Sequence, residues 1–231
     1  SKSLMMSLIM GLCAAAIFLA ICSINLTAQG LYQDEASGSV FQYKERNLIK
    51  NLLSFDILGN VVSPIKSIAY GAYMRFFNAD FSVYSWRLTG IISVCGGIIL
   101  FCIITYGSLS LFSLFLFLAL LITDGSVILS VRHDWGPVAL ELVFRLILIA
   151  VWIRSQLKNA HVFPKNAVFL FLLFGFSVYL KQSSVILIVP LILMVISGHN
   201  KYSKRSYYAC VLAFSIGILP LLLVNIKTFL K

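Results

Sequence analysis

Long apolar runs follow one another along most of this chain, and few charged residues interrupt them. The first run, residues 4–26, has the length of about 20 mostly apolar residues that a membrane-spanning helix needs. Of the 231 residues, 60% are hydrophobic and 11% are charged, whereas a soluble domain is about 45–50% apolar and about 25% charged. A water-facing globule of this size could not bury so much apolar surface. The chain is therefore expected to be an integral membrane protein.

The runs predict an all-α, multi-pass transmembrane bundle of about seven spans, which forms a single domain over residues 1–231. The first run is too long for the apolar core of a typical signal peptide, so we expect a retained signal anchor. The third run allows an alternative, in which residues 107–129 form one longer, broken helix. The predicted spans cover residues 4–26, 88–106, 109–123, 137–153, 167–180, 185–196 and 207–226.

The distribution of lysine and arginine predicts the orientation in the membrane, because short cytoplasmic loops carry an excess of these residues. The basic loops at residues 154–165 and 197–206 lie on the same side as Lys2 if the spans alternate. That side is therefore predicted to be cytoplasmic. The parts predicted to lie outside are residues 27–87, residues 124–136 and Lys181. Topology and anionic headgroups then explain the net charge of +10, and nucleic acid is not expected as a partner.

The outer segment, residues 27–87, is the only long hydrophilic stretch of the chain. Apolar residues recur in it at helical spacing, twice, with polar and charged residues between them. The two groups are Phe41, Leu48, Leu52 and Phe55, and then Ile65, Ile68, Ala69, Ala72, Tyr73 and Phe76. We expect two amphipathic helices that lie on the membrane surface.

Acidic residues are scarce, which makes the adjacent pair Asp34 and Glu35 informative. The pair follows the first predicted span closely and would lie near the outer membrane surface. Adjacent carboxylates can divide catalytic work, because one takes a proton from a hydroxyl while the other accepts hydrogen bonds or holds a metal ion. A divalent cation therefore stays open as a cofactor. The alternative is a charge pair that the helix dipole favours at a helix N-terminus.

A second polar cluster, Arg132-His133-Asp134, precedes the fourth predicted span, and Lys181 ends the fifth. In the cluster, Arg132 could bind a phosphate, Asp134 could orient a nucleophile and His133 could carry a proton. Lys181 could hold a substrate phosphate as a point charge. The alternatives are a hydrated turn for the cluster and, for Lys181, a side chain that extends to the lipid headgroups.

Glu141 and Arg145 lie four residues apart within the fourth predicted span, where isolated charges are costly. Their spacing and order favour an ion pair along one helix. One interpretation is a structural pair that faces other helices. The other is a polar site inside a transporter or channel subunit, although the sequence contains no internal repeat of the kind common in transporters.

Together, these elements resemble the GT-C class of membrane glycosyltransferases, in the branch of the protein O-mannosyltransferases and lipid A aminoarabinose transferases. In that branch an Asp-Glu pair opens a long outer loop, and a proline-containing segment leads into an aromatic amphipathic helix. Arginines precede the second span, Arg-x-Asp precedes the fourth, and a Leu-Thr-Lys-like element closes the fifth. The matching residues are Asp34-Glu35, Ser63-Pro64-Ile65, residues 69–78, Trp86-Arg87-Leu88, Arg132 with Asp134, and Leu180-Lys181-Gln182.

The resemblance implies an inverting enzyme that transfers a sugar from a polyprenyl-phosphate donor to an acceptor hydroxyl at the outer membrane surface. It implies Asp34, next to Glu35, as the catalytic base and Asp134 as a second acidic residue of the site. Lys181 and Arg132 would contact the donor phosphate. The expected partners are the lipid-linked donor, a lipid, glycan or protein acceptor, and membrane lipids, and the expected location is a bacterial inner membrane.

Two departures from the family pattern limit what the resemblance implies. Members usually carry His-Pro-Pro or Lys-Pro-Pro where this chain has Ser63-Pro64-Ile65, which leaves the substrate contacts of that loop open. Members are also far longer, so this chain is expected to lack their C-terminal part. A non-catalytic subunit that keeps the fold therefore stays an alternative.

Overall fold

The computed structural model of the chain describes residues 2–28, 30, 70, 76, 82–133, 138–157, 164–180, 182–189, 191–192 and 204–229. The regular elements of these residues are all helices, and no strand occurs among them. This confirms the predicted all-α class for the described part of the chain. The two predicted amphipathic helices of the outer segment lie outside it, apart from Tyr70 and Phe76.

The helices occur close to the predicted positions for six of the seven apolar runs. In the remaining run, predicted as a span over residues 185–196, the described part begins as a 3-10 helix instead of an α-helix. The elements are α1 (Lys2–Ser23), α4 (Val83–Thr105), α5 (Leu111–Thr123), α6 (Gly125–His133), α7 (Val138–Leu157), α8 (Pro164–Leu180), the 3-10 helix η3 (Gln182–Leu187) and α10 (Lys204–Phe229).

Three helices of the described part are long and apolar enough to cross a membrane, namely Leu4–Ser23, Val83–Thr105 and Arg205–Leu223. A fourth results if α5 and α6, which meet at 56°, form one broken span. The outward faces of α5 and α10 leave Phe112 74% and Leu212 62% exposed, as expected of surfaces that lipid covers. These features are consistent with membrane integration, while the count of about seven spans stays a prediction.

The start of α4 corrects one predicted boundary, because the helix begins at Val83 and not at residue 88. Ser82 is the N-cap, and its side chain accepts a hydrogen bond from the backbone N–H of Ser85 at 3.1 Å. Tyr70 reinforces this turn, because its hydroxyl is 2.6 Å from Ser85 Oγ and its ring packs edge to face against Trp86. Trp86 therefore belongs to a buried helix, not to the outer loop predicted for it.

The segment 124–136, predicted as an outer loop, contains the helix α6. Asp124 explains the break between α5 and α6. Its N–H donates to the carbonyl of Leu120 at the end of α5, while its Oδ1 accepts from the N–H groups of Ser126 and Val127 at 2.7 and 3.2 Å. One aspartate thus closes one helix and caps the next. The longer, broken helix considered for residues 107–129 corresponds to α5 and α6, a bent pair that begins at Leu111 and ends at His133; that the pair forms one span stays a prediction.

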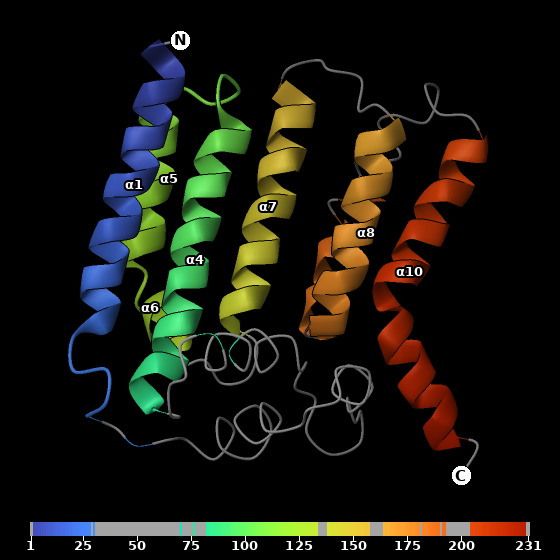
Figure 1. The fold of residues 1–231 in the computed structure, drawn as a ribbon. Coiled ribbons are helices and arrows are strands. Elements are labelled where there is room, and N and C mark those ends of the chain that lie inside the picture. The colour runs from blue at the N-terminus through green and yellow to red at the C-terminus, as the bar shows by residue number, and fades with distance from the viewer. Residues whose placement is uncertain are drawn as a thin grey trace.

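The helices pack in the order α1, α4, α7, α8, α10 across the molecule, and α5 and α6 pack against α1 and α4 (Figure 1). The core is divided into two apolar clusters. The first joins α1, α4, α5, α6 and one side of α7 around residues such as Phe18, Ile98 and Phe101. The second joins the other side of α7, through Leu148, to α8, η3 and α10. α7 is therefore the element that holds the two halves of the bundle together.

The helices α8 and α10 approach each other at a pair of glycines. A Cβ atom added to Gly217 would lie 2.5 Å from the carbonyl oxygen of Leu172 and 2.9 Å from the Cα atom of Gly175. Backbones come this close only where side chains are absent, which is a common way to pack helices in membranes. α10 also contains Pro220, and the helix changes direction along its length (Figure 1).

Candidate functional site

Several helix ends meet at one end of the bundle, the lower end in Figure 1. Arg87 near the start of α4 and Arg132 at the end of α6 both reach the chain just after α1. Glu141 near the start of α7 contacts the residues that follow α8. At the opposite end, Arg154 of α7 donates to the carbonyl of Ile104 of α4 at 3.1 Å. The directions of these helices therefore alternate, and the segments that follow α1, α6 and α8 all begin at the lower end.

Arg87 is a deeply buried charged side chain at the lower end, with 1% of its surface exposed. Its Nη1 donates to the carbonyl of Leu26 at 2.7 Å and its Nη2 to the carbonyl of Gly30 at 2.9 Å. Carbonyls after a helix C-terminus lack partners within the helix and carry partial negative charge, which a cation satisfies. Arg87 therefore anchors the chain at Leu26 and Gly30, upstream of the acidic pair Asp34 and Glu35 in the sequence.

Arg132, for which a hydrated turn was the alternative to phosphate binding, lies in the last turn of α6. Its Nη2 donates to the carbonyl of Ile24 at 2.6 Å. Within the described residues, its buried Nε has no hydrogen-bond partner. A guanidinium has five N–H groups, so part of its donor capacity stays open toward a ligand.

A pocket of about 150 Å³ lies between these elements. It has room for a group of phosphate size, and two arginines contribute to its wall. A cationic, partly enclosed site of this kind suits an oxyanion. Its lining residues are Asn25, Leu26, Ala28, Arg87, Leu129, Arg132 and His133.

Four of the residues predicted for the site, Asp34, Glu35, Asp134 and Lys181, lie outside the described residues. Their neighbours in the chain nevertheless locate the segments from which they come. The acidic pair follows Gly30, which Arg87 binds; Asp134 directly follows the end of α6; and Lys181 directly follows the end of α8. All three segments start at the lower end of the bundle, which is the arrangement that the predicted topology requires.

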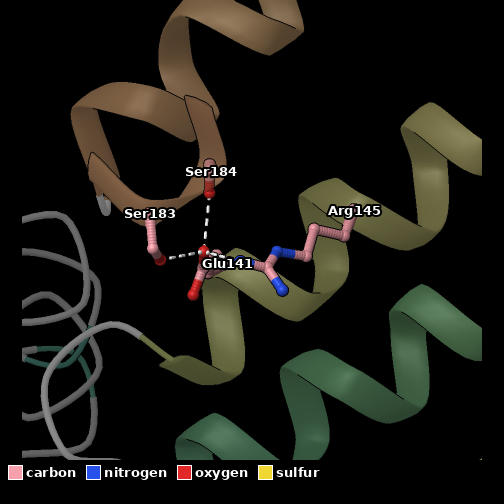
Figure 2. Close-up of polar contacts among 4 residues, drawn as sticks. All are labelled: Glu141, Arg145, Ser183 and Ser184. Carbon is pink, nitrogen blue, oxygen red and sulfur yellow. Dashed lines mark hydrogen bonds and ion pairs between the residues drawn. The ribbon is translucent and has the colours of Figure 1, made fainter. Parts of the chain in front are cut away.

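The predicted pair of Glu141 and Arg145 is confirmed, because Arg145 Nη2 lies 2.5 Å from Glu141 Oε1. Two further partners, Ser183 and Ser184, come from η3 and donate to the same oxygen at 3.2 and 2.6 Å (Figure 2). Glu141 is 3% exposed and lies in the first turn of α7. The carboxylate is therefore near the lower end of the bundle, and sequence spacing could not have predicted its serine partners.

Two features of the lower end were not indicated by the sequence as parts of a site. Arg87 was recognised only as one arginine before the second span, yet it lines the pocket. The hydroxyls that meet Glu141 come from serines 42 and 43 residues away. Within the described residues, no group of three or more His, Cys, Asp or Glu side chains could hold a metal ion, so the open question of a divalent cation rests on the acidic residues outside them.

Replacing Arg87 by Met should destabilise the protein, because the carbonyls of Leu26 and Gly30 would lose a buried donor. Each buried carbonyl left unpaired costs about 1–3 kcal/mol. Arg87→Lys should recover only part of the loss, because one ammonium group does not reproduce the fork of a guanidinium. Thermal unfolding of the purified protein in detergent measures both effects. The control is Arg205→Met, at an exposed position of α10; equal melting temperatures for the two Met variants would contradict this role of Arg87.

Comparisons of the chain with family models, with curated proteins and with solved structures found no match. The function is therefore inferred from the residues and from the geometry of the lower end.

Proposed function

We propose that this chain is a membrane-embedded glycosyltransferase. It takes a sugar from a polyprenyl-phosphate donor and transfers it, with inversion, to a hydroxyl of a lipid, glycan or protein acceptor. In this proposal the chain crosses the membrane about seven times, its N-terminus is cytoplasmic and the lower end of the bundle faces outward. The Lys and Arg residues of the predicted short loops support that orientation, and the expected membrane is a bacterial inner membrane.

One observation carries the proposal: a cationic pocket lies at the end of the bundle where the segments bearing Asp34, Asp134 and Lys181 begin. Transfer from a phosphate-linked sugar needs a base for the acceptor hydroxyl and cations for the departing phosphate. The proposed residues of both kinds are widely spaced in the sequence, and the described residues that precede each of them end at the lower end of the bundle. The resemblance to the GT-C class supports the same assignment.

In the proposed reaction, the Asp34 carboxylate accepts the proton of the acceptor hydroxyl as its oxygen attacks the anomeric carbon of the donor. The attack comes from the face opposite the phosphate, so the configuration inverts. The bond from the anomeric carbon to the phosphate oxygen breaks, and its electron pair leaves with the polyprenyl phosphate. The phosphate group thereby gains one negative charge. Asp134 is proposed as the second acidic residue and Glu35 as the hydrogen-bonding neighbour of the base.

The additional charge on the phosphate is proposed to be stabilised by Arg132 and Lys181. Arg132 lines the pocket, and its buried Nε has no hydrogen-bond partner among the residues that the structure describes. Preorganised donors act most strongly where charge develops in the transition state. The polyprenyl chain would remain in the lipid beside the apolar helices. This division of the donor between lipid and pocket agrees with a site at the end of the bundle and not at its middle.

A transporter-like function is the second candidate, and two observations favour it. The break between α5 and α6 gives a discontinuous helix pair, and Glu141 is a buried carboxylate. Transporters place such groups near the middle of the membrane. Glu141 instead lies in the first turn of α7, close to the lower end, which favours the glycosyltransferase.

The test is transfer of a labelled sugar from a polyprenyl-phosphate donor by the purified protein in detergent. Lys181→Ala should raise KM for the donor and reduce kcat/KM by about 10–100-fold, because a phosphate contact is lost in the ground state and the transition state alike. Lys165→Ala, at the other end of α8, is the matched control and should behave as the unchanged protein. No transfer by the wild type would contradict the proposed function, and an unchanged KM for Lys181→Ala would remove this lysine from the donor site.

A further inference from the structure

We propose that Glu141 is a positioning residue of the donor site, which rests on the function proposed above. Through Ser183 and Ser184, its carboxylate holds the start of η3, which follows Lys181 directly in the sequence. The network formed by Glu141, Arg145, Ser183 and Ser184 is called the Glu141 network below (Figure 2).

The geometry concentrates three donors on one oxygen. Glu141 Oε1 accepts from Arg145 Nη2 at 2.5 Å, from Ser184 Oγ at 2.6 Å and from Ser183 Oγ at 3.2 Å. Ser184 has no exposed surface, so water cannot replace the hydroxyl without a rearrangement. Buried carboxylates are tolerated only when charge and hydrogen bonds are supplied in this way. The network thus makes a specific link between α7 and η3.

The link is placed where it can determine the position of Lys181. On one side of that residue, Leu180 ends α8 and is completely buried. On the other side, the fully buried Ser184 is tied to Glu141. The described residues on both sides of Lys181 in the sequence are therefore anchored, one side by apolar packing and the other by the carboxylate. A lysine side chain is long and flexible, so the position of its backbone decides which phosphate it can reach.

The alternative is that Glu141 serves only to neutralise the charge of Arg145. Arg145 can be neutralised by Glu141 along the helix without any contribution from η3. The two serines add nothing to that charge balance, yet both point their hydroxyls at the same oxygen. Their contribution is to the relative position of α7 and η3. This distinction makes the serines, and not Glu141 itself, the better sites for a test.

The test compares Ser183→Ala/Ser184→Ala with the wild type. Removal of two hydrogen bonds to a charged group should raise the hydrogen–deuterium exchange rate of the η3 amides by about tenfold or more. The same variant should raise KM for the polyprenyl-phosphate sugar by about tenfold and leave kcat within about twofold. The matched control is Ser177→Ala, which removes a fully buried hydroxyl that has no hydrogen-bond partner within the described residues; it should alter neither quantity.

The same double alanine change in a Lys181→Ala protein distinguishes positioning of Lys181 from a general loosening of the fold. If the Glu141 network acts through Lys181, the double alanine change should raise KM in the wild type and add nothing in a Lys181→Ala protein. Equal increases of KM in both backgrounds would overturn the proposal, as would unchanged exchange of η3. The exchange rates do not depend on activity. A wild type without transfer would overturn the proposed function and donor positioning with it, while the exchange measurement still decides whether the serines hold η3 against α7.

Discussion

Asp34→Asn is expected to reduce the turnover of sugar transfer by about 10²–10⁴-fold, the range that general-base assistance supplies. The change keeps the size of the side chain and one acceptor oxygen, but it removes the basic carboxylate. KM for the donor should change little, because the acidic pair is assigned to the acceptor hydroxyl. The measurement is the initial rate of transfer by the purified protein at saturating donor, with the melting temperature recorded for each variant.

Two variants serve as controls for the base. Asp56→Asn makes the same chemical change elsewhere in the predicted outer segment and should leave turnover unchanged. Glu35→Gln should cost less than Asp34→Asn, because Glu35 is assigned a hydrogen-bonding role. A well-folded Asp34→Asn protein with full turnover would refute the catalytic assignment, and a larger loss in Glu35→Gln would move the base by one residue.

Gly217→Val should cause a large loss of stability, because it places a side chain where α8 and α10 are in backbone contact. A Cβ atom there would lie 2.5 Å from the carbonyl oxygen of Leu172 and 2.8 Å from the backbone nitrogen of Phe176. Neither is the end of a flexible side chain, so α8 and α10 would have to separate. Overpacking of a tight interior lowers the free energy of unfolding by about 1–3 kcal/mol and occasionally more. A clash with backbone atoms is expected to cost an amount near the top of that range. Thermal unfolding in detergent measures the loss.

The control for this substitution is Gly96→Val in α4, where an added Cβ atom meets nothing within 4 Å. Both changes place a β-branched residue in an apolar helix, so helix propensity contributes similarly to each. A difference between them therefore reports the contact of α8 with α10. If Gly217→Val melted at the temperature of Gly96→Val, the close approach of the two helices would be wrong.

The positions of the helices were predicted from the apolar runs of the sequence. They agree with the structure because each helix depends mainly on its own residues. A run of apolar residues long enough for a span also forms backbone hydrogen bonds within itself, so its position depends little on the rest of the fold. α5 ends at Thr123 as predicted and α8 ends at Leu180 as predicted. Their starts differ by only a few residues from the predicted ones.

The errors arose where a polar side chain changed the course of a helix. Ser82 caps α4 several residues before the apolar run begins, which brings Trp86 and Arg87 into the helix. Asp124 ends α5 and caps α6, so a segment predicted as a loop is helical. Such caps depend on one or two side-chain contacts, and hydropathy does not detect them.

The sequence by itself determined that the chain forms apolar helices, several of them long enough to span a membrane, because apolar length is a property of each segment alone. It also determined that Glu141 and Arg145 form an ion pair, because the two residues lie one helical turn apart. Only the tertiary structure decided that Arg132 meets Ile24, 108 residues away, and that Ser184 meets Glu141, 43 residues away. Contacts across such distances depend on how the helices pack, and packing is set by shape and by backbone approach, as at Gly175 and Gly217.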